Sequence, residues 1–260
     1  MDTWQEGSTY DGYMGRWSRH LADEFVGWLN VPVDSRWVDV GCGTGALAEA
    51  IAQSASPTSV AGIDPSPGFI AAARARLGDS ADLRVGDAQL LPFDDGGFDA
   101  AVSAIALNFV PDPRLAVREM ARVTAKGGVV ATYLWDYAEG MEMIRLFWDA
   151  AVALDPSIAH LDEATRFPLC RPERLADLFR TADLTDLEAT SLEVPTVFEG
   201  FDAYWQPMLG DQGPIPTYVG SLDPAERQSL EHRLRDHLPT DADGSIALRA
   251  RAWAVRGTVR

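Results

Sequence analysis

The stretch Trp37-Val-Asp-Val-Gly-Cys-Gly-Thr-Gly45 decides the fold. A short apolar run containing Asp39 leads into three glycines at alternate positions, and Ala46–Gln53 then favours a helix. This order predicts a buried strand, a tight glycine turn and a helix. Such a turn lets backbone approach a ligand closely, and the first N–H groups of the helix point towards that ligand.

The same alternation of strand and helix continues to residue 135. Further strands are expected at Ser59–Ile63, Leu83–Val85, Phe98–Ser103 and Val129–Trp135. Helices are expected to begin at Ser66-Pro67 and Asp112-Pro113, because each pair places a capping side chain directly before a proline. The pattern predicts an α/β fold with a mostly parallel, doubly wound sheet that helices cover on both faces.

The second half of the chain is less regular. Helices are expected over Ser18–Leu29, Gly140–Leu154, Pro172–Thr181 and from Asp223 onwards, and strands over Leu184–Val194 and Ile246–Val255. The two strands would lie near the sheet edge and complete a seven-stranded sheet. Phe198–Tyr218 is rich in aromatic residues, proline and glycine, and is expected to be an ordered loop.

Composition excludes several classes of protein. Hydrophobic residues make up 47% and charged residues 23%, as in a globular chain with a real core. The formal net charge of −17 disfavours nucleic acid and anionic membranes as partners, although it leaves a local basic patch open. Two cysteines cannot form a disulfide framework, and neither a secretory signal nor a membrane-length apolar run is present. A cytoplasmic setting is expected.

Three carboxylates accompany the glycine turn. Asp64 ends the second expected strand about 20 residues beyond Gly45, where a carboxylate can accept hydrogen bonds from a ribose diol. Asp87 ends the third expected strand, and Asp39 lies inside the first, where a cationic group nearby would explain a buried carboxylate. With Ala46 the glycine spacing also fits a dinucleotide-binding turn, so that interpretation stays open.

Four segments in this order resemble class I S-adenosylmethionine-dependent methyltransferases, in particular the small-molecule branch that includes ubiquinone and menaquinone biosynthesis enzymes. The segments are Val38–Gly45, Gly62–Ser66, Gly86–Phe93 and Phe98–Asn108. The N-terminal Tyr13–Ser18 also resembles a segment that folds over the cofactor in some members. The resemblance covers the first half of the chain and implies a Rossmann-like methyltransferase fold, S-adenosylmethionine as cofactor and methyl transfer to a small-molecule acceptor.

The resemblance also assigns contacts with the cofactor. They fall on Arg16, Gly41, Gly43, Thr44, Gly45, Asp64, Pro65, Ser66, Asp87, Ala88 and Ala104. In the family the glycine turn wraps the methionine part, the carboxylate after the second strand binds the ribose hydroxyls, and the carboxylate after the third reads the adenine edge. Ala104 would contact the methionine side through its backbone, and Arg16 would pair with the methionine carboxylate.

Residues beyond these motifs are expected to form the acceptor site. The aromatic candidates for its wall are Trp135, Tyr137, Tyr204 and Trp205. We expect one domain over residues 1–260, in which residues 1–30 cover the cofactor and residues 136–170 and 198–238 form a lid. No catalytic base is assigned, because one is needed only if the acceptor is protonated. No metal site is expected, and the protein is expected to be a monomer or homodimer.

Two other functions remain open. A NAD-dependent oxidoreductase could use the same glycine turn, but Ala101–Phe109 holds no Tyr-x-x-x-Lys or similar pair for hydride transfer. A non-catalytic relative could bind S-adenosylmethionine and regulate a partner. Methyl transfer to any acceptor would eliminate this second alternative.

Overall fold

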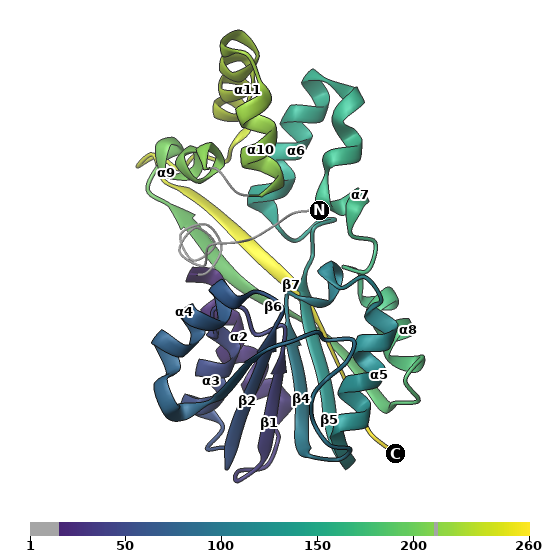
Figure 1. Ribbon diagram of the computed structural model, residues 1–260. Coiled ribbons are helices and arrows are strands. Elements are labelled where there is room, and N and C mark those ends of the chain that lie inside the picture. The colour runs from purple at the N-terminus through teal and green to yellow at the C-terminus, as the bar shows by residue number, and fades with distance from the viewer. Residues whose placement is uncertain (1–15, 211–212) are drawn as a thin grey trace.

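A computed structural model describes residues 16–210 and 213–260, and its strands form one seven-stranded sheet. The strands are β1 (Arg36–Val40), β2 (Ser59–Asp64), β3 (Asp82–Val85), β4 (Phe98–Ala104), β5 (Thr124–Trp135), β6 (Thr185–Phe198) and β7 (Ile246–Thr258). Their order is β3-β2-β1-β4-β5-β7-β6, and β7 runs antiparallel to both of its neighbours. The predicted seven-stranded, mostly parallel sheet is confirmed, with both late strands at one edge (Figure 1).

Helices lie on both sides of this sheet. The helices of the described residues, including those of a cap beyond one end of the sheet, are α2 (Arg16–Leu29), α3 (Ala46–Ser54), α4 (Pro67–Leu77), α5 (Pro113–Val123), α6 (Glu142–Leu154), α7 (Glu163–Arg166), α8 (Pro172–Arg180), α9 (Phe201–Trp205), α10 (Pro214–Ser221) and α11 (Pro224–His237). Short 3-10 helices are η2 (Gly78–Ser80), η3 (Leu107–Phe109), η4 (Pro156–Leu161) and η5 (Gln206–Leu209). Figure 1 shows α2, α3 and α4 on one side of the sheet and α5 and α8 on the other. Within the described chain, no helix combines the length and hydrophobicity needed to span a bilayer.

Side-chain caps fix where the helices begin. The Ser66 hydroxyl accepts a hydrogen bond from the Phe69 N–H at 3.3 Å, and Asp112 accepts from the first turn of α5 at 3.0 and 3.1 Å. Asp223 and Glu226 form a reciprocal capping box at the start of α11. Each cap satisfies N–H groups that have no partner inside the helix. The helix starts predicted from Ser66-Pro67, Asp112-Pro113 and Asp223-Pro224 are confirmed.

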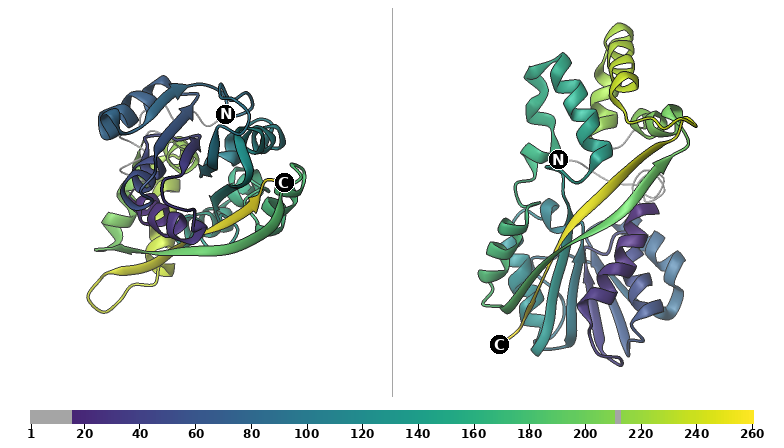
Figure 2. Two further views of the ribbon diagram at one scale, coloured as in Figure 1. Left: turned by 90° about the horizontal axis from the view of Figure 1, so that it is seen from below. Right: turned by 180° about the vertical axis from the view of Figure 1, so that it is seen from behind.

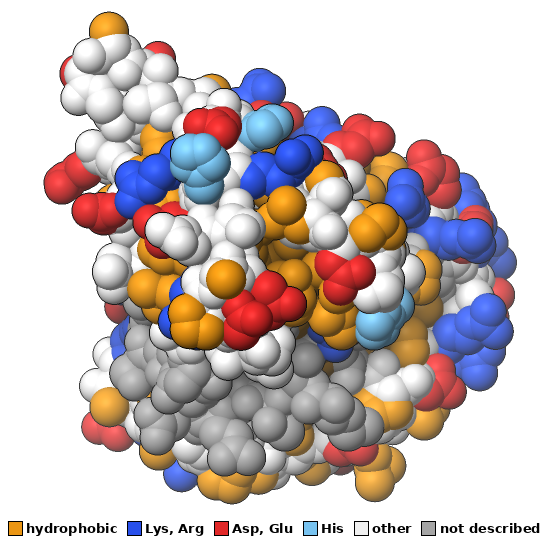
Figure 3. Space-filling view, turned by 90° about the horizontal axis from the view of Figure 1, so that it is seen from above, with side chains coloured by type: hydrophobic (Ala, Val, Ile, Leu, Met, Phe, Trp, Pro, Cys, Tyr) orange, Lys and Arg blue, Asp and Glu red, His pale blue; other side chains and the backbone are white. Residues whose placement is uncertain are grey.

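A helical cap sits beyond one end of the sheet. The long β6–β7 hairpin runs past the other strands, and α6, α9, α10 and α11 lie beside its far end (Figures 1 and 2). Seen from above, charged side chains surround apolar ones on this cap (Figure 3). The predicted ordered loop over Phe198–Tyr218 is wrong, because the segment holds α9, η5 and most of α10. Helices of five and eight residues are too short to show a helical period in the sequence. In addition, a proline such as Pro214 is typical both of a turn and of the first residue of a helix.

One arginine joins the last strand to the first described helix. The Arg256 guanidinium on β7 donates to the carbonyl oxygens of Trp28 and Leu29 at 3.3 and 2.8 Å, and to Glu188 on β6 at 2.8 Å. Those carbonyls end α2, where the helix dipole favours a positive charge. The contact therefore anchors α2 across the edge of the sheet that β6 and β7 build.

We predict that Arg256→Gln lowers the free energy of unfolding by about 1–2 kcal/mol, because it removes hydrogen bonds from two carbonyls and one carboxylate. Urea unfolding followed by circular dichroism measures this change. Arg180→Gln is the matched control, since Arg180 is exposed and pairs with Asp177 on the same helix, three residues away. Equal losses in the two variants would contradict the anchoring role.

Candidate functional site

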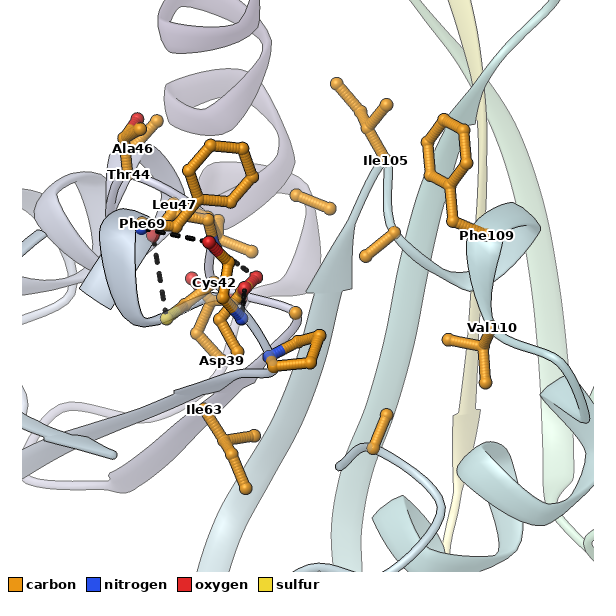
Figure 4. Close-up of a pocket in the computed structure, with 18 of the residues that line it drawn as sticks. Asp39, Cys42, Thr44, Ala46, Leu47, Ile63, Phe69, Ile105, Phe109 and Val110 are labelled. Atoms are coloured by element: carbon orange, nitrogen blue, oxygen red, sulfur yellow. Dashed lines mark hydrogen bonds between the residues drawn. The ribbon is translucent and has the colours of Figure 1, made fainter. Parts of the chain in front are cut away.

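A cavity of about 600 Å³ opens at the carboxyl ends of β1, β2 and β4 (Figure 4). Its size suits a small-molecule ligand. Most residues that the resemblance implicated line it, namely Gly41, Gly43, Thr44, Asp64, Pro65, Ser66, Asp87, Ala88 and Ala104. Gly45 is not part of this wall, and the side chain of Arg16 and all of Tyr13 to Gly15 lie outside the described residues.

The glycine turn brings the backbone of β1 against the loop after β4. Gly41 has φ +75°, and a Cβ atom there would clash with the Cβ of Ala106. The N–H groups of Gly41 and Cys42 both donate to the Ile63 carbonyl, at 2.8 and 3.0 Å. Gly45, with φ +87°, instead lies against Ala73 and Leu77, which are one turn apart on α4. The first glycine therefore shapes the cavity, whereas the last one lets two helices approach.

The Asp64 carboxylate is held in a fixed orientation at the end of β2. One oxygen accepts the Gly43 N–H at 3.0 Å and the other accepts the Ser66 N–H at 2.8 Å. Burial raises the pKa of Asp64, and these two N–H groups oppose the rise. Each carboxylate oxygen can accept a further hydrogen bond. The group is thus a pre-oriented acceptor that can bind two hydroxyls.

Asp39 is fully buried beside the cavity without a counter-charge. No described side chain donates a hydrogen bond to either of its carboxyl oxygens, and a weak contact with the backbone of Ala48 remains. Burial, followed by the charge of Asp64, raises the pKa of Asp39 to about 8, while the backbone contact with Ala48 acts in the opposite direction. A buried carboxylate in this state costs free energy unless it is protonated or meets a cation. Among the described residues that line the cavity, none is a lysine or arginine.

Asp87 lies at the exposed rim of the cavity, two residues beyond the end of β3 and not at the strand end as predicted. Its carboxylate accepts hydrogen bonds from the Gln89 backbone at 2.9 Å and the Gln89 side chain at 3.1 Å. Gln89 in turn accepts the Asp112 N–H at 3.0 Å, so the turn is fastened to the start of α5. This network orients Asp87 for contact with a ligand edge.

Backbone strain is concentrated at Ile105, directly after β4. Its φ is +54°, a conformation that β-branched residues rarely adopt. The other described non-glycine residues with positive φ are all Asn, Asp or Ser. The Ile105 N–H keeps a hydrogen bond to the Tyr133 carbonyl at 2.9 Å, so the strand pairing holds the strained turn in place. Ile105 lines the cavity opposite Asp39 and Thr44 (Figure 4).

The four aromatic residues predicted for an acceptor wall lie elsewhere. Trp135, Tyr204 and Trp205 are buried in the core, and the Tyr204 hydroxyl donates to the Met143 carbonyl at 2.9 Å. Tyr137 is also buried. None of the four lines this cavity as far as residues 16–210 and 213–260 define it.

Sequence reasoning missed several apolar residues of the cavity wall, among them Phe69, Ile105 and Phe109. Phe109 comes shortly after the predicted strand Phe98–Ser103, as Tyr137 comes after Val129–Trp135, so the rule that ligands bind beyond strand ends could have identified it. For Ile105 no sequence signal exists. Cys42 lines the cavity as a buried thiol. Burial, followed by the charges of Asp39 and Asp64, raises the pKa of this thiol. Cys42 is therefore suited to packing and not to nucleophilic attack.

Comparisons with known proteins agree with this geometry. A family of methyltransferase domains matches residues 38–132. A 2-methyl-6-phytyl-1,4-hydroquinone methyltransferase from Synechocystis is 27% identical over 75% of this chain and 61% of its own length. A demethylmenaquinone methyltransferase from Paenarthrobacter aurescens is 36% identical over 45% of this chain and 44% of its own length. The chain thus spans less than two thirds of either relative.

Among solved structures, the YcgJ protein from Bacillus subtilis superimposes with a TM-score of 0.59. The match covers 93% of this chain and 98% of that one at 19% sequence identity. The likeness therefore extends through the late strands and the cap, beyond residues 38–132. The chain has the Rossmann-like fold of class I methyltransferases.

We predict that Asp39→Asn changes the dependence of stability on pH. Because the folded-state pKa of Asp39 exceeds the ordinary value, the folded wild type binds more protons than the unfolded chain between pH 4 and 8, and its stability falls as pH rises through that window. Asp39→Asn removes this loss, so it should gain at least about 1 kcal/mol relative to wild type between pH 5 and 8.5. Urea unfolding at both pH values measures it, and a difference that is independent of pH would contradict the assignment.

A second prediction concerns the strain at Ile105. At ordinary positions alanine is more stable than glycine, but at φ +54° only glycine avoids the Cβ clash. Ile105→Gly should therefore be more stable than Ile105→Ala by about 1 kcal/mol. Thermal unfolding of the two variants measures the order, and the ordinary order, with alanine more stable, would show that the turn is not strained.

Proposed function

On the premise that the chain carries a methyltransferase domain at residues 38–132, we propose that the protein transfers a methyl group from S-adenosylmethionine to a small-molecule acceptor. The observation that carries this proposal is the buried, unpaired carboxylate of Asp39 beside a glycine turn and the oriented carboxylate of Asp64. Together they form a site that lacks a cation and offers acceptors to a diol.

The residues present fit this cofactor. Asp39 would hold its ammonium group by charge, and the backbone at Gly41 and Gly43 would lie along the amino-acid part. Asp64 would accept hydrogen bonds from the ribose hydroxyls, and Asp87 would accept one from the adenine amino group. Arg16, Thr44, Gly45, Pro65, Ser66, Ala88 and Ala104 stay proposed as further contacts.

The charge of the cavity favours this cofactor over NAD. Asp39, Asp64 and Asp87 all line it, and the described lining residues include no basic side chain. NAD would bring two phosphates to a turn that already lies beside the Asp64 carboxylate, and no basic side chain among the described lining residues would offset their repulsion. S-adenosylmethionine brings an ammonium and a sulfonium in place of the phosphates.

When bound, the cofactor supplies a methyl group on positively charged sulfur, which is already an activated electrophile. The protein's own residues then need only to bind, orient and exclude water. Leu47, Phe69 and Ile105 give the cavity an apolar wall that keeps water away from the reacting atoms. Transfer to an acceptor that is nucleophilic as it binds needs no dedicated base.

We propose that the acceptor is of the quinone or hydroquinone type. The support comes from the two relatives, whose names state a hydroquinone and a demethylmenaquinone as their substrates. Residues 136–170 and 198–238 would form the lid and the acceptor pocket, since they supply the helices of the cap beyond one end of the sheet. A single domain over residues 1–260 remains part of the proposal.

We predict that the wild type binds S-adenosylmethionine and S-adenosylhomocysteine, and that Asp64→Ala weakens both affinities by about 10- to 100-fold, because the variant loses an oriented acceptor for two hydroxyls. Isothermal titration calorimetry measures the change. Asp82→Ala is the control, since Asp82 on β3 is exposed and pairs with Arg84 outside the cavity. The absence of binding by folded wild type would overturn the proposed function.

Methyl transfer itself is tested with radiolabelled cofactor and a panel of hydroquinone acceptors. Transfer to any member is the expected result and eliminates a non-catalytic, regulatory role. Binding of the cofactor without transfer to any hydroquinone would contradict the proposed acceptor class.

A further inference from the structure

An exposed aromatic ring stands on the wall of the cavity. Phe109 ends η3, lines the cavity and is 43% exposed. It is the only aromatic residue among the large hydrophobic side chains that the structure leaves exposed in residues 16–210 and 213–260. Figure 4 places it beside Ile105, across the cavity from Asp39 and Thr44. An apolar ring at this place gains free energy only when a ligand covers it.

The turn that places this ring is conformationally strained. Ile105 holds the strained conformation that turns the backbone out of β4, and η3 begins two residues later. Within η3 the Leu107 side chain is fully buried, which anchors the turn in the core. Local strain of this kind persists where the surrounding structure enforces it, and it is common at ligand sites. The buried Leu107 and the strained Ile105 together fix the base from which Phe109 projects.

A second aromatic ring from the distant insertion supports the first. Phe167, between α7 and α8, meets Phe109 edge to face, with ring centroids 5.1 Å apart and planes at 75°. Tyr137, just after β5, packs on Phe167 at 5.6 Å, and the guanidinium of Arg166 lies 5.2 Å from the Phe167 centroid. The edge contact restrains the Phe109 ring, which retains exposed surface. The three rings form a row from the cavity wall to the end of β5.

We infer that Phe109, held in place by Phe167, is the ring-binding residue of the acceptor site and selects acceptors with a planar unsaturated ring. This inference rests on the proposed function. A planar ring can stack on the Phe109 ring and gains a quadrupole contact beyond the burial of surface, whereas a saturated ring of similar size gains burial alone. Phe109 and Phe167 offer no hydrogen-bonding group, so this part of the site discriminates by flatness and not by polar substituents.

The test compares two probes that differ in unsaturation, 2-naphthol and 2-decalol, each titrated into protein saturated with S-adenosylhomocysteine. The wild type should bind 2-naphthol at least about tenfold more tightly than 2-decalol. Phe109→Ala should lose at least tenfold in 2-naphthol affinity, and Phe109→Leu should lose the preference between the probes, because leucine keeps apolar area without a ring. The affinity for S-adenosylhomocysteine is measured for each variant, so that every probe titration uses saturated protein.

The matched control is Leu115→Ala, since Leu115 on α5 is 42% exposed and does not line the cavity. It should leave both probe affinities unchanged. Equal affinities of the wild type for the two probes, or an unchanged preference in Phe109→Leu, would overturn the assignment of Phe109 while cofactor binding stands. Failure of the wild type to bind S-adenosylhomocysteine would overturn the proposed function and this inference with it.

Discussion

A carboxylate buried without a counter-ion is the constraint on which the site depends. Strand β1 carries Asp39 into the core because its neighbours Trp37, Val38 and Val40 are all fully buried. Two residues later the chain turns on Gly41, and the next strand brings Asp64 beside it. The fold thereby places two acids at one edge and leaves one of them unpaired, an unfavourable arrangement that only a bound cation or a proton relieves.

The wall of the cavity opposite Asp39 contains a second unfavourable feature, a strained turn after β4. Gly41 and Ala106 approach so closely that no larger residue fits in the turn, and Ile105 is forced into a left-handed conformation next to them. Strand pairing between β4 and β5, together with the buried Leu107, supplies the rigidity that holds this strain. Both walls of the cavity therefore hold a feature that lowers the stability of the fold. This is expected where a structure is shaped to bind a ligand and not to maximise its own packing.

The sheet and its helix starts could be predicted because they depend on local signals. Short apolar runs that alternate with helix-forming segments mark the strands. Ser66, Asp112 and Asp223 each precede a proline at a helix start. The carboxylates at 39, 64 and 87 could be recognised because parallel strands bring their carboxyl ends to one edge. The short helices at Phe201–Trp205 and Pro214–Ser221 escaped prediction, since neither is long enough to show a period.

The apolar side of the cavity could not be read in the same way. Trp135 and Tyr204 are aromatic residues of the kind that often line ligand sites. Here the late strands and the cap, which are distant in sequence, bury them. The pairing of Phe109 with Phe167 joins two segments whose contact depends on how the insertion folds back. The strain at Ile105 arises from tertiary pairing with β5, and isoleucine itself gives no sign of it.

The most direct test of the account is a calorimetric titration of S-adenosylhomocysteine at pH 7 in two buffers of different ionisation enthalpy. Asp39 is mostly protonated at this pH in the free protein, so an ammonium group binding beside it should expel that proton. The account predicts that wild type releases a substantial fraction of a proton more than Asp39→Asn does. Binding with the same proton balance in both proteins would contradict the claim that Asp39 receives the cation.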